Sequence, residues 1–152
     1  MGNLLVALMN ERSRMPTKTY TSDVGFDLYT SEETIVEPRG ISEVHCGIRV
    51  ELPWGTFAFL MGRSSTSYRL GLIVITGVID PGFNGELFAQ VVNTTDKPVK
   101  IEVGQRICQL VIMDVTDASP REVIEVPEDF LDSVNKDFNR RRNINGFGSS
   151  GQ

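Results

Sequence analysis

This sequence of 152 residues has only two cysteines, no surplus of basic residues and no long apolar run. The two cysteines, Cys46 and Cys108, lie in strand-like apolar runs, which favours reduced core thiols over a bridge and indicates an intracellular, cytoplasmic setting. No apolar run is long enough to span a bilayer, so no membrane association is expected. Residues 4–9 lack the basic start and the small-residue cleavage site of a signal peptide and are interpreted as a first strand.

The charge balance is acidic, with 15 Lys and Arg against 20 Asp and Glu and a net charge of −5 at pH 7. General nucleic-acid binders need a broad basic face, so this class is not expected, and an anionic ligand would need local arginines. The length fits one compact domain with a single core. No internal repeat and no interdomain linker is visible.

Most of the sequence alternates with a period of two, most clearly at Val44, Cys46, Ile48, Val50 and Leu52. Many short strands separated by Gly and Pro turns predict an all-β, single-domain fold of the sandwich or jelly-roll kind. The further strands expected are residues 34–37, 56–61, 72–76, 86–93, 98–103, 107–114 and 122–126.

Three segments depart from the strand pattern. Residues 64–69 are expected to form one helical turn opened by a hydroxyl cap, which would present backbone N–H groups to an anion. Residues 128–134 are expected to form a short helix. The remainder, 135–152, is polar and Gly-rich, and its composition alone favours a disordered tail.

One acidic residue, Asp80, lies at the mouth of an expected hairpin, between the strand at 72–76 and the strand that begins near Glu86. Pro81-Gly82 and Asn84-Gly85 predict tight turns between them. A carboxylate held by rigid strands on both sides can serve as a general base. The alternative is a turn residue that hydrogen-bonds its own turn.

Five stretches in a fixed order carry a resemblance that covers nearly the whole chain. Together they resemble the motifs of the trimeric dUTPases, which hydrolyse dUTP to dUMP and pyrophosphate and keep uracil out of DNA. The resemblance implies a jelly-roll-like fold, a homotrimer, Mg²⁺ as cofactor, a core of residues 1–138 and a flexible closing arm of residues 139–152. The stretches are residues 24–28, 62–65, 77–92, 104–110 and 142–151.

The motifs at residues 62–65, 104–110 and 24–28 imply a site for the triphosphate. Arg63, Ser64 and Ser65 would hold the phosphate chain, with a planar cation, hydroxyls and backbone donors. Gln109 would add a polar contact, unless it is a solvent-facing strand residue. Asp27 would orient waters on the Mg²⁺ bound to the triphosphate. The alternative interpretation is that Asp27 is an acidic residue of a turn.

The third motif implies the reaction and the base site. Asp80 would position and deprotonate a water for attack on the α-phosphorus. The hairpin backbone at Gly77, Val78 and Ile79 would pair with the uracil edge. Phe83 stands where the family usually has Tyr. It would pack under the deoxyribose and exclude a 2′-hydroxyl. The alternative interpretation is that Phe83 is a core aromatic beside the turn.

The fifth motif implies that the arm completes the site. Arg142 would reach the γ-phosphate, Phe147 would stack on uracil, and Gly148, Ser149 and Ser150 would lie along the phosphates. Departures from the family pattern occur at Val74, where some members have Asn, at Phe83, and at Asn143 and Asn145, which replace glycines.

Two other functions stay open at this point. A dCTP deaminase, or a bifunctional enzyme, shares the motifs at 62–65 and 79–83, but its proton-shuttling glutamate would fall at Gln90, and an amide cannot shuttle protons. A dUTPase-like regulatory protein that binds a protein partner is the second alternative. Product analysis with dUTP, dCTP and UTP separates the enzymes, and an ordinary turnover rate separates an enzyme from a regulator.

Overall fold

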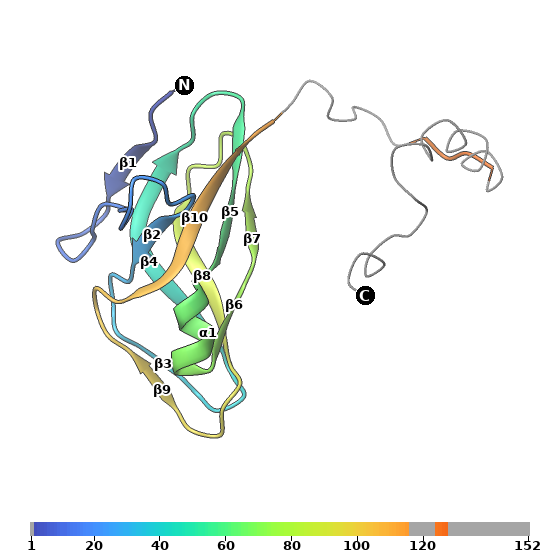
Figure 1. Cartoon of the computed structure of the whole chain (residues 1–152). Coiled ribbons are helices and arrows are strands. Elements are labelled where there is room, and N and C mark those ends of the chain that lie inside the picture. Colours follow the sequence, from blue (N-terminus) through green and yellow to red (C-terminus); the bar gives the residue numbers. More distant parts are fainter. Residues whose placement is uncertain (1, 116–123, 128–152) are drawn as a thin grey trace. The chain divides into compact units, whose positions relative to one another are not determined.

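The computed structural model describes residues 2–115 and 124–127. Two compact units divide the chain, Met1–Asp117 and Ala118–Gln152, and the elements below all belong to the first. Figure 1 labels the elements along the chain. They are β1 (Leu5–Leu8), β2 (Phe26–Tyr29), β3 (Thr34–Val36), β4 (Ile41–Glu51), β5 (Thr56–Gly62), α1 (Ser64–Leu70), β6 (Leu72–Ile75), β7 (Gly77–Ile79), β8 (Glu86–Asn93), β9 (Val99–Ile101) and β10 (Arg106–Asp114).

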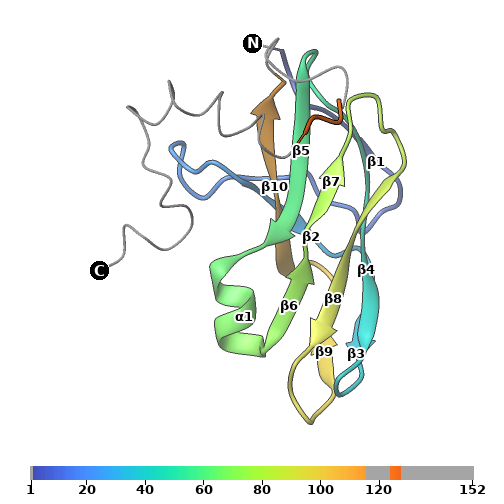
Figure 2. The same cartoon turned by 90° about the vertical axis from the view of Figure 1, so that its right-hand side faces the viewer.

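Two four-stranded antiparallel sheets, with orders β1-β4-β8-β6 and β2-β10-β5-β7, make up most of this unit, and β3 and β9 form a small third sheet. Figure 2 shows β5, β10 and β7 on one side and β4, β8 and β1 on the other. The all-β prediction is therefore confirmed. Within residues 2–115 and 124–127, no helix has the length and apolar character needed to cross a membrane.

The core lies between the two large sheets and is built by strand alternation. On β4, Val44, Cys46, Ile48 and Val50 are buried, as the period of two predicts. The Sγ atom of Cys46 lies 4.0 Å from that of Cys108 on β10, which places the two sheets face to face at this point. Both thiols are free and buried, as expected from the sequence.

The strand boundaries agree with the sequence prediction to within three residues, the largest difference being the start of β4 at Ile41 in place of Val44, but two strands were not predicted separately. These are β2 and β7, which are four and three residues long. The predicted strand at 122–126 is wrong for its described part, because residues 124–126 are irregular. The helix predicted at 128–134 lies outside the described residues.

Helix α1 confirms the predicted helical turn but not its cap. Its N-cap residue is Arg63, with no side-chain cap hydrogen bond, so the expected hydroxyl cap is wrong. Ser65 lies inside the helix, and its hydroxyl instead receives a bond from the Arg63 guanidinium at 3.4 Å. The helix ends at Gly71, which adopts φ 64° and donates its N–H to the Ser67 carbonyl.

The predicted hairpin around Asp80 is divided between the two sheets. Strand β6 pairs with β8 in the register Leu72↔Asn93 to Ile75↔Gln90, as expected for a hairpin. The chain then crosses over, and β7 pairs with β5 instead, with Val78 opposite Phe59. The third motif therefore opens between the sheets rather than closing on itself.

Candidate active site

A carboxylate bound by two arginines forms the centre of a polar cluster at the end of β5. Arg63 Nε donates to Asp27 Oδ1 at 2.6 Å, and Arg106 Nη1 donates to Asp27 Oδ2 at 3.2 Å. The Asp27 side chain is only 12% exposed, which makes this ion pair more than a surface contact. Two positive charges against one negative charge leave the cluster cationic, as an anionic ligand requires.

Gln109 is held in place beside this cluster by its neighbours. It lies opposite Asp27 in the β2–β10 ladder, and its Nε2 donates to the Gly62 carbonyl at 2.9 Å. A Cβ atom added at Gly25 would collide with Gln109 Oε1, so the glycine leaves the space that the amide fills. The side chain is half-buried and oriented, which differs from a freely solvated strand glutamine.

Arg106 is a candidate site residue that the sequence interpretation missed, although it lies within the fourth motif. It begins β10, next to the bulge that shifts the β10–β2 register between Arg106 and Cys108. Its carbonyl also accepts from Arg63 Nη1 at 3.2 Å, so the two arginines are linked. Its position in the Gly104-Gln105-Arg106 run was the available signal.

Asp27, Arg63 and Gln109 border a polar pocket of about 370 Å³. The structure brings together Asp27, Arg63, Ser64 and Gln109, four of the residues predicted for the triphosphate and its metal. Ser65 lies behind Arg63 and supports its guanidinium. The lining residues are Thr19, Asp23, Val24, Gly25, Asp27, Arg63, Ser64, Gln109 and Val111.

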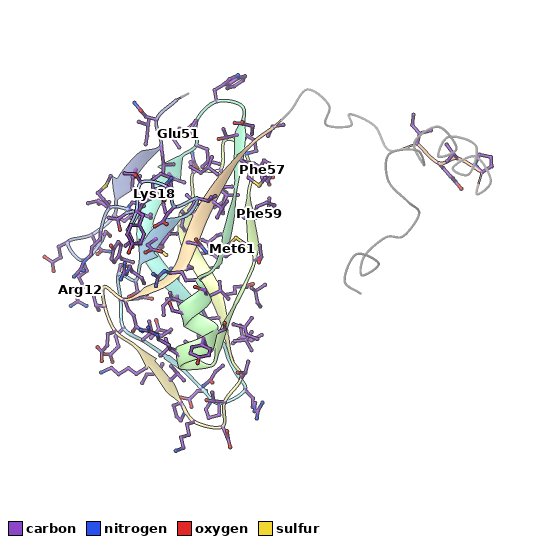
Figure 3. The ribbon with its side chains drawn as sticks, viewed as in Figure 1. Arg12, Lys18, Glu51, Phe57, Phe59 and Met61 are labelled. Atoms are coloured by element: carbon purple, nitrogen blue, oxygen red, sulfur yellow. The ribbon has the colours of Figure 1, made fainter. Side chains whose placement is uncertain are left out.

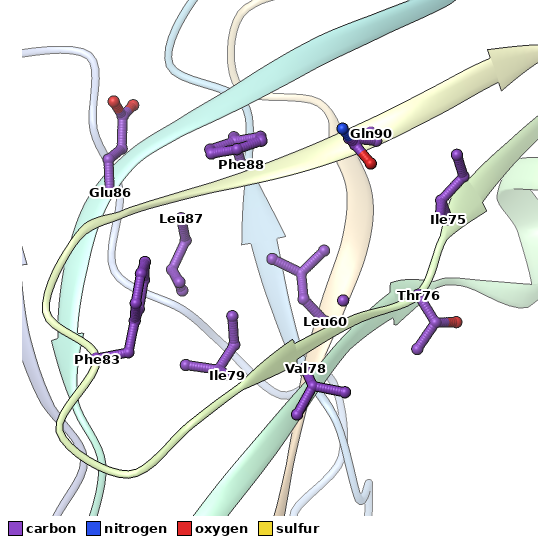
Figure 4. A pocket seen from close by; sticks show the side chains of 11 residues that line it. Leu60, Ile75, Thr76, Val78, Ile79, Phe83, Glu86, Leu87, Phe88 and Gln90 are labelled. Carbon is purple, nitrogen blue, oxygen red and sulfur yellow. The ribbon is translucent and has the colours of Figure 1, made fainter.

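A second pocket of about 270 Å³ opens where β7 and β8 separate into different sheets. Figure 4 shows Phe83 at one end and Gln90 with Ile75 at the other. Because β7 pairs with β5 and not with β8, backbone groups on the facing edges remain available to a ligand. The lining residues are Leu60, Ile75, Thr76, Gly77, Val78, Ile79, Phe83, Glu86, Leu87, Phe88 and Gln90.

Asp80 immediately follows β7 and is exposed. Its carbonyl accepts the N–H of Phe83 at 3.1 Å, and Gly82 has φ 80°, which fits a type II turn with Pro81 at its second position. The turn is thus closed by the backbone of Asp80. In the described part of the chain, its carboxylate makes no hydrogen bond, which leaves it available for chemistry.

Phe83 lies over the backbone of Gly85. A Cβ atom at Gly85 would come within 2.7 Å of Phe83 Cζ, so the ring can occupy this place only because residue 85 has no side chain. The ring is 42% exposed and borders the second pocket. It is therefore a wall of the pocket and not a core aromatic.

Comparisons with known proteins identify the family of this chain. A family model described as dUTPase matches residues 11–151. The chain belongs to the dUTPase family. It is similar to the deoxyuridine 5′-triphosphate nucleotidohydrolase of Clostridium novyi, with 33% identity over 97% of this chain and 98% of that protein, and to that of Tropheryma whipplei, with 36% identity over 90% and 88%. A Staphylococcus bacteriophage 80alpha dUTPase solved with dUpNHpp has a TM-score of 0.74 and 26% identity, over 85% of this chain and 94% of that one.

The two pockets of this dUTPase family member share no lining residue. Between them, β5 carries an apolar outer face, because residues directly opposite in an antiparallel ladder point to the same side. Figure 3 shows its labelled side chains Phe57, Phe59 and Met61 along β5. We define the outer face as Phe57, Phe59, Met61, Val78, Val111 and Met113.

The described residues offer a metal ion few direct side-chain ligands. Among the described residues, no three His, Cys, Asp or Glu side chains come together as a metal cage. Asp27 has each oxygen bound to an arginine, yet a carboxylate offers about four acceptor positions, so it can still accept a water. The donor set fits a hydrated Mg²⁺ reached through water.

The dUTPase residues expected in the arm lie outside the described residues. These are Arg142, Phe147, Gly148, Ser149 and Ser150. Their roles stay predictions, as does the division at residue 138.

Proposed function

We propose that this protein hydrolyses dUTP to dUMP and pyrophosphate. The proposal rests on one observation above all, the pairing of Asp27 with Arg63 and Arg106 inside a chain that matches the dUTPase family over residues 11–151. The relatives named above carry this activity in their names, and the described residues provide suitable groups for each part of the substrate.

The first pocket would bind the triphosphate. The Asp27 carboxylate fixes the Arg63 guanidinium through Nε, which leaves donors on the far side of the fork for phosphate oxygens. Ser64, the first residue of α1, and Gln109 add neutral donors. Ser65 acts through Arg63, so its contact with phosphate is indirect in this geometry.

The second pocket would bind deoxyuridine. Its apolar walls suit a pyrimidine ring, and the free edges of Gly77, Val78 and Ile79 on β7 can pair with the uracil edge. Phe83 would lie against the sugar and leave no room for a 2′-hydroxyl. A phenyl ring retains this packing without the phenol of the usual tyrosine.

Asp80 would act on the attacking water. The carboxylate accepts a proton as the water oxygen bonds to the α-phosphorus, and the bond from that phosphorus to the bridging oxygen of the β-phosphate breaks, so pyrophosphate leaves. Nothing in the described chain competes for this carboxylate, and the Pro81-Gly82 turn fixes the backbone beside it.

A homotrimer would bring the two pockets into one site. Each pocket is incomplete alone, since Arg63 borders one and the other adjoins Asp80, and the outer face between them is apolar and partly exposed in the described residues. Val78 and Met113 on that face are 58% and 47% exposed, which is costly in a free monomer. A cyclic assembly would cover the face and place one chain's first pocket beside another chain's second pocket.

Mg²⁺ would arrive with the triphosphate and supply charge neutralisation on its oxygens. Asp27 would hold one of its waters while it continues to orient Arg63 and Arg106. Residues 139–152, with Arg142, Phe147, Gly148, Ser149 and Ser150, would close over the bound nucleotide. Two free, buried cysteines suit an intracellular enzyme.

Product analysis with dUTP, dCTP and UTP tests the proposal. We expect dUMP and pyrophosphate from dUTP and no deamination of dCTP, because Gln90, which lines the second pocket, cannot exchange protons as a glutamate does. Release of ammonia from dCTP would favour the deaminase. Failure to convert dUTP would contradict the proposed function and leave the regulatory role as the alternative.

A further inference from the structure

Strand β4 holds the loop after Asp80 by side-chain contacts in place of a regular ladder. The β4–β8 pairing is continuous up to His45↔Phe88 and then shifts before Arg49↔Glu86. At the shift, Gly47 adopts φ 63°, the left-handed conformation that favours glycine. A Cβ atom there would come within 2.6 Å of Ser31, so the irregularity is fixed by packing.

The carboxylate of Glu86 takes the place of the missing ladder acceptor. The Gly47 N–H donates to Glu86 Oε1 at 3.2 Å, and His45 Nδ1 lies 3.1 Å from the same oxygen. The Glu86 side chain is 28% exposed, so solvent screens these contacts only in part. One oxygen atom therefore joins two positions of β4 to the first residue of β8.

Neighbouring contacts extend this attachment back towards Phe83. Arg49, opposite Glu86 in the ladder, donates from Nε to the Asn84 carbonyl. Asn84 directly follows Phe83, whose ring lies over Gly85 and borders the second pocket. Residues 84–86 thus connect the Phe83 ring to β4.

We propose that Glu86 is a positioning residue that fixes the Phe83 loop through Gly47 and His45, and that it thereby sets the selection of 2′-deoxyribonucleotide over ribonucleotide. The inference rests on the proposed function, since it concerns the sugar of that substrate. Glu86 also lines the second pocket, but its Oε1 is already bound to the Gly47 N–H and lies beside His45, so the proposed action is through the loop. Loss of the acceptor at Oε1 would let Phe83 move away and admit a 2′-hydroxyl.

Glu43 provides a matched control on the same histidine. His45 Nε2 lies 3.5 Å from Glu43 Oε2, so His45 stands between two carboxylates. Glu43 is paired with Gln90 in the middle of the β4–β8 ladder, and its side chain is 56% exposed. Removing it takes a carboxylate from His45 without touching residues 84–86.

The test compares Glu86→Ala, Glu86→Gln and Glu43→Ala with the wild-type chain, by kcat and KM for dUTP and UTP and by the thermal midpoint. We expect Glu86→Ala to lower the dUTP-to-UTP ratio of kcat/KM by about tenfold or more, chiefly through a lower KM for UTP, because the displaced ring no longer excludes the 2′-hydroxyl. Glu86→Gln retains an acceptor and should keep the ratio within about threefold of wild type, and Glu43→Ala should leave it unchanged.

An unchanged ratio in a folded Glu86→Ala protein overturns the inference, and so does an equal loss in Glu43→Ala. An equal loss in Glu86→Gln and Glu86→Ala overturns the acceptor role. Should Glu86→Ala not fold, Glu86→Asp serves in its place, because it withdraws the oxygen while keeping the charge, and it should also lower the ratio. A wild-type chain without activity on dUTP counts against the proposed function, whereas an active one with an unaltered ratio counts against this inference alone.

Discussion

Asp80 is the residue on which the proposed hydrolysis depends most directly. Its carboxylate makes no hydrogen bond within the described residues, and the adjoining turn is closed by its backbone carbonyl. We therefore expect Asp80→Asn to keep the fold and the binding of a non-hydrolysable dUTP analogue while lowering kcat by about 100-fold or more. Steady-state turnover measures kcat, and titration with the analogue measures its binding. Near-normal turnover in this variant would place the base elsewhere.

Gly25 acts on the site through the space it leaves for Gln109. We expect Gly25→Ala to displace the amide from the Gly62 carbonyl and raise KM for dUTP, because the added methyl group and Gln109 Oε1 cannot share the space. If this is its only effect, the double variant Gly25→Ala/Gln109→Ala should match Gln109→Ala alone. A double-mutant cycle on kcat/KM measures the coupling, and strictly additive losses would contradict it.

The buried Cys108 thiol makes the stability of the core depend on pH. A hydrogen bond with Cys46, together with burial, raises the pKa of Cys108 well above its usual value. An unfolded cysteine ionises near about pH 8.5, so above that pH the unfolded state loses a proton that the folded state keeps. The free energy of unfolding should therefore fall with rising pH, by up to about 1.4 kcal/mol per pH unit. Urea unfolding in reducing buffer measures this slope, and Cys108→Ala should remove the contribution.

Much of the candidate site could be predicted from residue types in order along the chain, but the partners of each residue could not. The motifs placed Asp27, Arg63 and Gln109 in one phosphate site, and the structure brings them together. Arg106 was missed because arginine at a strand start has many ordinary roles. Only the β2–β10 pairing shows that it shares Asp27 with Arg63.

Among the elements, β7 shows the limit of sequence periodicity. Residues 72–79 are apolar apart from Thr76 and Gly77, and a period of two cannot tell which sheet each part joins. The crossover between Ile75 and Gly77 is decided by distant partners, β8 for the first part and β5 for the second. Strand β2 was also missed, and its burial does not alternate, since the adjacent residues Asp27 and Leu28 are both buried.

Strand β5 carries the prediction that belongs to this scale. Phe59 lies in the centre of the outer face, opposite Val78 and Val111 and in edge contact with Phe57 at a centroid distance of 5.2 Å. We expect Phe59→Lys to prevent assembly and abolish most activity, since a charge cannot be buried there without a partner. Ile35→Lys, on the exposed side of β3, is the control and should leave both unchanged. Sedimentation measures assembly, and an assembled, active Phe59→Lys protein would contradict the proposed interface.

For the whole molecule, the separation of the two pockets predicts that a site is built from different chains. Arg63 borders the first pocket, and Asp80 adjoins the second, so Arg63→Ala and Asp80→Asn damage opposite halves of the proposed site. Each variant alone should be nearly inactive.

Co-expression of these two variants tests this arrangement. If one chain's first pocket meets another chain's second pocket around a closed ring, random mixing gives about a quarter of the sites two intact halves. Activity should therefore recover to about that fraction of wild type, although no chain in the mixture is wild type. Were both halves of a site supplied by one chain, every site would keep one damaged half, and the mixture would be as inactive as its parents. Such a result would require Arg63 and Asp80 of the same chain to approach the same phosphates, which the separate linings of the two pockets argue against.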